Sequence, residues 1–193
     1  MLRNADAKMT RERCEISRRH KAVHDAYCRG DLEGLRFALD DPPDFPNCHQ
    51  PFALAVGDYP LEYAIYWSPV AFITQLIRLG ADPNYRDSAG FPSLIAALSA
   101  RRPDTNQTVE LLLQSGADVG QRGVNDWTPL HYAVMERNLA AVELLLVSGA
   151  DPHLKTRIDD CTSPLEDAEA VGFTEAAALM RDAPPNRARE RRR

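Results

Sequence analysis

The sequence has no apolar run approaching the roughly 18 residues that a membrane-spanning helix needs, and its charged N-terminus lacks the apolar core of a secretory signal. It contains only four cysteines, none in C-x-x-C spacing, which favours reduced thiols and a cytoplasmic location. It has no phosphate-binding loop, nucleophile elbow or paired-carboxylate motif. We therefore expect no catalytic residues, no cofactor and no bound metal.

Basic residues are scarce outside the two ends of the chain. The whole sequence holds 23 Lys and Arg against 28 Asp and Glu, a net charge of −5. Residues 1–21 and 187–193 together contain 12 of the basic and 4 of the acidic residues, so the body between them carries a net charge of −13. Such an acidic body disfavours binding of nucleic acid. An alternative stays open for the ends themselves, which could bind nucleic acid or an anionic membrane surface through counterion release.

Residues 127–152 contain two helical patterns in succession. Thr128 is a suitable N-cap, Pro129 stands at the first helical position, and Gly149 follows the second pattern, where a left-handed residue ends a helix. Apolar residues recur in both patterns at the spacing of one buried helix face: Leu130, Ala133 and Val134, then Leu139, Val142, Leu145 and Leu146. One such helix pair cannot bury its own apolar face, so the pattern predicts neighbours of the same kind.

The same pattern recurs along the chain. Its leading leucines, separated by 33, 36 and 35 residues, are Leu61, Leu94, Leu130 and Leu165. The Gly-Ala-Asp triplet occurs three times, beginning at Gly80, Gly116 and Gly149. With Thr-Pro-Leu-His-Tyr-Ala at 128–133, this period resembles the ankyrin repeat.

The resemblance covers roughly residues 20–183 and implies an all-α fold, an α-solenoid of about five helix-turn-helix repeats with finger loops similar to β-hairpins. The segment 1–19 is expected to be charged and flexible, and the basic tail 184–193 flexible as well. The expected divisions of the repeat domain are a capping repeat with an insertion over 20–58, repeats over 59–91, 92–127 and 128–162, and a C-terminal cap over 163–183. The insertion breaks the period at 41–58, and we expect either a loop packed over the first repeats or part of a binding surface.

Two sets of polar residues have structural roles in the family that the sequence resembles. His131 is expected to bond the Thr128 turn and tie it to the next repeat, and His24 is expected to do the same in the first repeat. Asp82, Asp118 and Asp151 recur in the Gly-Ala-Asp turns, where an aspartate bonds its own backbone. These residues are therefore expected to be neither catalytic nor metal-binding.

In ankyrin repeats the finger tips and the exposed face of each first helix line a concave groove that binds a partner. Carried over position by position, the expected partner-binding residues are Asp58, Ser88, Phe91, Asn125, Trp127, Asp159 and Asp160 on the fingers, and Tyr66, Trp67, Met135 and Glu136 on the first helices. Phe91 and Trp127 would stand at equivalent places on adjacent fingers, and such aromatic anchors often dominate interfaces. Two alternatives remain: Trp127 only stiffens the fingers, and the insertion, including Phe52, covers Tyr66 and Trp67.

The resemblance implies a binding module, a monomer that holds one unidentified protein partner and acts as a regulator, an inhibitor or an adaptor. The small size and the lack of a second recognisable domain are similar to stand-alone bacterial ankyrin proteins. An enzyme is the less favoured reading, because an open solenoid groove rarely provides a closed pocket with a perturbed pKa.

Overall fold

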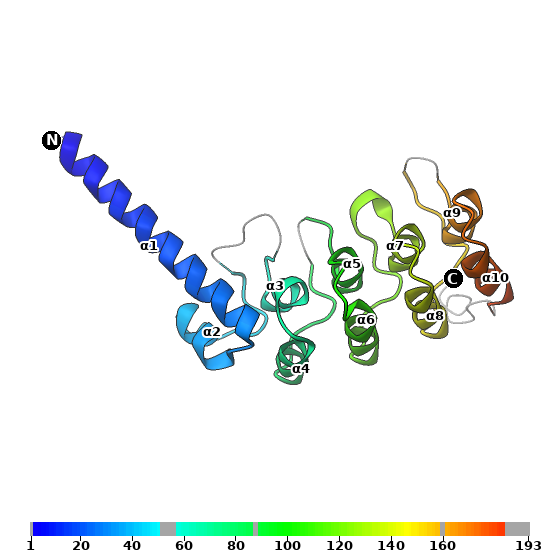
Figure 1. The fold of residues 1–193 in the computed structure, drawn as a ribbon, viewed down its shortest axis with the longest axis horizontal. Helices are drawn as coiled ribbons and strands as arrows, with labels where there is room; N and C mark the ends of the chain where they lie inside the picture. The colour runs from blue at the N-terminus through cyan, green and yellow to red at the C-terminus, as the bar shows by residue number, and fades with distance from the viewer. Residues whose placement is uncertain (1, 51–56, 87–88, 159–160, 184–193) are drawn as a thin grey trace. The chain divides into compact units, whose positions relative to one another are not determined.

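A computed structural model describes the chain over residues 2–50, 57–86, 89–158 and 161–183, with side chains from residue 15 onward. These residues form ten α-helices and one short 3₁₀ turn, and no strand occurs among them (Figure 1). The chain divides into two compact units, residues 1–81 and 82–193. Among the described residues, no helix is both long and apolar enough to cross a membrane.

The first unit contains four helices. They are α1 (Leu2–Arg29), α2 (Leu32–Ala38), α3 (Pro60–Trp67) and α4 (Val70–Arg78). Helix α1 starts inside the segment 1–19, which the sequence predicted to be flexible. No proline or glycine interrupts its sequence, so nothing in the local chemistry stops the helix before Gly30. Asp31 caps α2 by accepting a hydrogen bond from the Gly34 amide at 2.9 Å.

The described part of the insertion is bonded to the helices around it. Gln50 is buried, and its side-chain oxygen accepts a 2.9 Å hydrogen bond from the Tyr27 hydroxyl on α1. Its side-chain amide nitrogen donates to the Gly57 carbonyl at 3.1 Å, while its backbone N–H donates to the Asp58 carbonyl at 2.9 Å. Gln50 thereby ties the insertion to α1 and to the start of the next repeat. Residues 51–56, with Phe52, lie outside the described residues.

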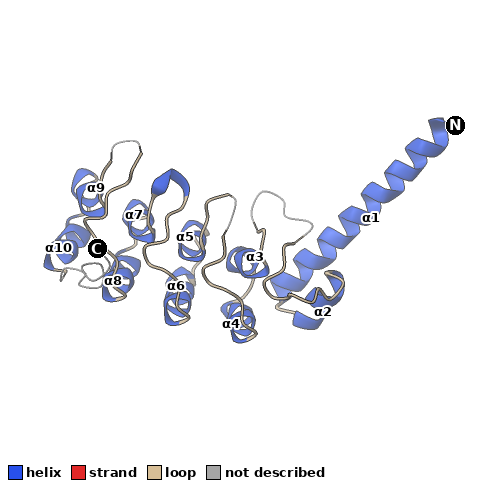
Figure 2. Ribbon diagram, turned by 180° about the vertical axis from the view of Figure 1, so that it is seen from behind, coloured by secondary structure: helices blue, strands red, loops and turns tan. Residues whose placement is uncertain are grey.

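The second unit contains three helix pairs, one in each of the predicted ranges 92–127, 128–162 and 163–183. The pairs are α5 (Ser93–Ser99) with α6 (Thr105–Gln114), α7 (Pro129–Met135) with α8 (Leu139–Val147), and α9 (Pro164–Ala170) with α10 (Thr174–Asp182). Helices α5, α7 and α9 pack side by side in one row, and α6, α8 and α10 form a second row (Figure 1). Seen from behind, the loops before α7 and α9 extend to one side of these rows (Figure 2). The 3₁₀ turn η1 (Val124–Asp126) lies in the loop before α7.

The core of this unit consists of the apolar residues that the period predicts. Leu130 of α7 and Leu145 of α8 are fully buried, as are Leu112 of α6 and Ala176 of α10. Helices α7 and α9 begin with Pro129 and Pro164, which have no backbone N–H to satisfy, and each follows an extended capping residue, Thr128 or Ser163.

Glycine follows the ends of α6 and α8, as expected. Gly116 and Gly149 have φ values of +88° and +90°, which a residue with a Cβ atom adopts only at a cost. After each, the next amide returns to the helix, Ala117 to the Leu112 carbonyl at 3.0 Å and Ala150 to the Leu145 carbonyl at 2.9 Å. These hydrogen bonds turn the chain sharply towards the next finger. The end of each second helix is therefore determined by residues in its own last turn.

Candidate protein-binding surface

Two of the Gly-Ala-Asp turns, at 116–118 and 149–151, lie beside a small polar pocket between two loops. The Oδ1 atom of Asp118 accepts a hydrogen bond from the Gly120 amide at 2.8 Å, and Oδ1 of Asp151 accepts one from the His153 amide at 2.9 Å. Asp82 makes the equivalent bond to the Asn84 amide. The prediction that these aspartates bond their own turns is confirmed.

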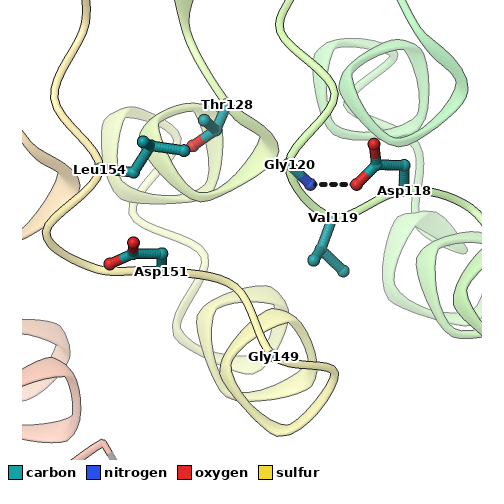
Figure 3. A pocket seen from close by; sticks show the side chains of 7 residues that line it. All are labelled: Asp118, Val119, Gly120, Thr128, Gly149, Asp151 and Leu154. Atoms are coloured by element: carbon teal, nitrogen blue, oxygen red, sulfur yellow. Dashed lines mark hydrogen bonds between the residues drawn. The ribbon is translucent and has the colours of Figure 1, made fainter. Parts of the chain in front are cut away.

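Figure 3 shows Asp118 and Asp151 on two different loops that line this pocket, whose volume is about 100 Å³. Each carboxylate already holds its own turn. Within the described ranges, no group of three or more His, Cys, Asp or Glu side chains could hold a metal ion. We attribute the pocket to the path of the loops.

His131 links the start of α7 to the next finger. Its Nδ1 atom accepts a hydrogen bond from the Thr128 amide at 3.1 Å and lies 2.8 Å from the Thr128 hydroxyl oxygen. On the other side of the ring, Nε2 lies 3.3 Å from the Thr162 carbonyl. Because Nδ1 accepts from an amide, Nε2 carries the proton and donates to Thr162. The predicted structural role of His131 is confirmed, and burial lowers the pKa of the imidazole from its usual value.

His24 does not repeat this arrangement, so the prediction that it ties a threonine turn is wrong. Its Nδ1 atom lies 3.0 Å from the hydroxyl of Tyr63 on α3, and its ring meets Trp67 edge-on at 5.4 Å. The cause lies in α1, which runs without a break through residue 24, so no turn precedes His24 and Lys21 takes the position that Thr128 has before His131. In α3 the histidine position is taken by Glu62, which accepts bonds from the Gly57 and Asp58 amides at 3.0 and 2.9 Å. His24 therefore packs against aromatic side chains.

A buried carboxylate fastens two fingers of the second unit together. The side chain of Asp126 is 7% exposed and accepts hydrogen bonds from the backbone N–H of Arg157 at 2.7 Å and from its guanidinium. Arg122 pairs with the same carboxylate and donates to the Lys155 carbonyl at 2.9 Å. The hydrogen bond from Arg157 is the main cause that lowers the pKa of Asp126. Sequence reasoning missed this site; the only local signal was Arg122, four residues before the aspartate.

Trp127 follows this carboxylate directly and packs on its own helix. It is half-buried, stacks on His131 with 6.4 Å between ring centroids and 13° between planes, and meets Tyr132 edge-on at 5.2 Å. Trp127 thus stiffens the base of its finger while part of the ring stays accessible. Phe91, its predicted counterpart on the preceding finger, is also half-buried, and its carbonyl accepts a bond from the Tyr85 hydroxyl at 3.2 Å.

A continuous strip of side chains extends from Trp127 along α7, and we call Trp127, Tyr132, Met135 and Glu136 the α7 strip. Tyr132, Met135 and Glu136 follow the three- and four-residue spacing that places side chains on one helix face. Burial raises the pKa of Tyr132, and the nearby charge of Glu136 raises it further. Met135 is 45% exposed, and the Glu136 carboxylate pairs with Arg101 through bonds of 2.9 and 2.8 Å. Tyr132 was absent from the predicted set, although its spacing from Glu136 could have indicated it.

The remaining predicted residues are distributed over both units. Asn125 is exposed at the tip of η1 with φ +58°, a conformation that asparagine tolerates. In the first unit, Trp67 is 48% exposed at the end of α3, while Tyr66 and Asp58 are half-buried. Ser88, Asp159 and Asp160 lie outside the described residues.

Comparison with known proteins identifies the class that these repeats define. A family model described as ankyrin repeats in three copies matches residues 61–156. The chain belongs to the ankyrin repeat family, and its helices form the α-solenoid of that family.

Three relatives illustrate the match. The chain is 31% identical over 159 residues to the ankyrin repeat and KH domain-containing protein mask-1 of Caenorhabditis elegans, covering 82% of this chain and 6% of that protein. It is 34% identical over 125 residues to alpha-latrocrustotoxin-Lt1a of Latrodectus tredecimguttatus, which is 64% of this chain and 8% of the toxin. It is 40% identical over 78 residues to the human mitochondrial disaggregase, 40% of this chain and 11% of that protein. The chain thus spans about a tenth or less of these relatives' lengths.

Proposed function

We propose that this protein is a binding module without enzymatic activity and that the α7 strip contacts its partner protein. Ankyrin repeats are generally protein–protein interaction modules. The observation that carries the proposal is the accessible Met135 side chain at the end of a helix face that begins with a rigidly held Trp127. A pre-positioned aromatic and a flexible methionine provide apolar contact area at little cost in ordering.

The strip matches the anatomy of a non-obligate interface. Apolar side chains lie at its centre, and the Glu136–Arg101 ion pair stands at its edge, where it contributes to specificity and association rate more than to affinity. The finger that presents Trp127 is held by the ion pairs of Asp126 with Arg122 and Arg157, so it has little conformational freedom left to lose on binding. We infer a monomer in a cytoplasmic setting that regulates, inhibits or links its partner.

The test compares the same chemical change at two equivalent positions. Met135 is the last residue of α7 and 45% exposed, whereas Val147 is the last residue of α8, in the other row of helices, and 90% exposed. Met135→Asp and Val147→Asp place the same charge at the same place in a helix, so their effects on the helix itself are matched.

The measurement is quantitative copurification from a native lysate, with helicity checked by circular dichroism. A protein retained by the wild type and by Val147→Asp but lost with Met135→Asp supports the proposal. Equal retention by both variants refutes it and moves the interface elsewhere. The basic ends are the remaining candidate: binding through them would fall steeply with salt and would be abolished by deleting residues 187–193.

A further inference from the structure

A thiol and an imidazole lie together on the exposed side of α1, in the first unit. His24 and Cys28 are four residues apart, the spacing that places two side chains next to each other on a helix. The Sγ atom of Cys28 lies 3.4 Å from Nε2 of His24, within hydrogen-bonding distance for sulfur. Cys28 is exposed and His24 is half-buried, so a reagent reaches the sulfur while the ring behind it is held in place.

Helix α3 orients the imidazole. The Tyr63 hydroxyl lies 3.0 Å from Nδ1, and Trp67 packs edge-on against the ring at 5.4 Å. Burial raises the pKa of Tyr63, so its phenol stays neutral at physiological pH and its oxygen can accept a hydrogen bond. A neutral imidazole carries one proton. When Nδ1 donates that proton to Tyr63, the lone pair of Nε2 faces Sγ.

We propose that Cys28 is a reactive thiol that exchanges with low-molecular-weight disulfides and carries the resulting mixed disulfide as a reversible modification. A nucleophile, a base in contact with it and a third group that orients the base form the arrangement that activates a side chain for attack. The thiolate is the attacking species in disulfide exchange. His24 is the group that promotes it here.

The step balances without any further reagent. His24 Nε2 takes the Cys28 proton, and Sγ attacks one sulfur of the disulfide R–S–S–R. The bond between the two reagent sulfurs breaks as the Cys28–S–R bond forms. The departing thiolate leaves with the electron pair and receives the proton from His24. Cys28 is oxidised, and one sulfur of the disulfide is reduced and released as one equivalent of the small thiol R–SH.

Two other cysteines of the described residues provide internal controls. Cys161, in the second unit, is also exposed, and it measures how fast an exposed thiol of this protein reacts in the absence of the α1–α3 cluster. Cys48 is 4% exposed in the first unit, and burial raises the pKa of its thiol. Its protection from reagent therefore shows that the first unit is folded.

The adduct would also have a local reporter. Trp67 contacts His24 and is 48% exposed, so a mixed disulfide at Cys28 would form beside it and change its fluorescence. The chain has two tryptophans, and Trp127→Phe removes the signal of the second. Trp67 is also among the residues that the sequence predicts to bind a partner, although it lies outside the α7 strip. The exchange reaction does not depend on that prediction.

The experiment treats the full chain with oxidised glutathione at neutral pH and follows each cysteine-containing peptide by mass spectrometry. We expect Cys28 to form the mixed disulfide about tenfold faster than Cys161, and His24→Gln to remove most of that difference while Cys48 stays protected. Trp67 fluorescence should change with the same rate as Cys28 modification. Equal rates for Cys28 and Cys161 in the wild type would overturn the proposal even if the His24 variant failed to fold. An unchanged Cys28 rate in a folded His24→Gln variant would overturn it as well. Neither result depends on a partner, so the outcome is independent of the Met135 comparison.

Discussion

The stability of the second unit should fall as the pH is lowered through the range in which a free histidine gains a proton, because His131 is held neutral. The ring is fully buried, Nδ1 accepts from the Thr128 amide and Nε2 donates to Thr162. A second proton on Nδ1 would face an amide N–H and remove the bond that caps α7. Burial accordingly lowers the pKa of His131 below its usual 6.5.

The sign and the ceiling of the effect follow from proton linkage. Below pH 6.5 the unfolded chain binds a proton at this histidine that the folded chain does not, so stability decreases as the pH falls. If His131 takes up no proton in the folded state between pH 6.5 and 5.5, this one group lowers the free energy of unfolding by about 1 kcal/mol over that range. Above neutral pH His131 no longer makes stability pH-dependent, because its imidazole is then neutral in both the folded and the unfolded chain.

The assay is urea unfolding of the wild type and of His131→Gln at pH 7.5, 6.5 and 5.5. Glutamine keeps an acceptor and a donor but does not titrate, so subtracting its pH dependence removes the contribution of every other ionisable group. We expect the wild type to lose more stability than the variant between pH 6.5 and 5.5, by up to about 1 kcal/mol. Parallel pH profiles would show that folded His131 takes up its proton as readily as the unfolded chain, and would refute the single-tautomer arrangement.

Two further substitutions test the core and the fastening of the fingers. Leu145→Ala opens a cavity at a fully buried site and should lower the stability measured by urea unfolding by about 2–5 kcal/mol. The control Val147→Ala changes a side chain that is 90% exposed and should alter stability by less than about 0.5 kcal/mol. Similar losses for the two variants would contradict the finding that Leu145 is buried and Val147 is not. Asp126→Asn removes the charge that holds Arg122 and Arg157 and should cost about 1–3 kcal/mol at pH 7. The difference in stability between the wild type and this variant should shrink as the pH falls towards the lowered pKa of Asp126, because the carboxylate then loses its charge. A variant as stable as the wild type at pH 7 would rule out a stabilising role for the ion pairs.

Local chemistry explains why so much of the fold follows from the sequence. The N-cap at Thr128, the buried face that includes Leu145 and the left-handed Gly149 each involve residues within one helical turn of one another. Their repetition at a nearly constant period then requires a stack, because a single helix pair leaves its apolar face open. The sequence alone therefore predicts the helix pairs, their stacking and the turns that the aspartates bond.

The tertiary structure alone decided which side chains meet across the repeats. Asp126 and Arg157 are 31 residues apart, and His24 and Tyr63 are 39 apart, so their contact depends on how successive elements pack and which rotamers that packing permits. The prediction for His24 failed because the repeat pattern placed it by analogy with His131, whereas α1 continues through residue 24 without a turn and packing on α3 brings the imidazole to Tyr63.

The same distinction applies to the surface. The sequence predicted that both Trp127 and Met135 occupy exposed positions of a repeat. The structure distinguishes them: the Trp127 ring packs on His131 and is half-buried, whereas Met135, at the end of α7, is accessible. Sequence spacing determines the helix face to which a residue belongs. How much of that side chain remains available to a partner depends on its neighbours in three dimensions.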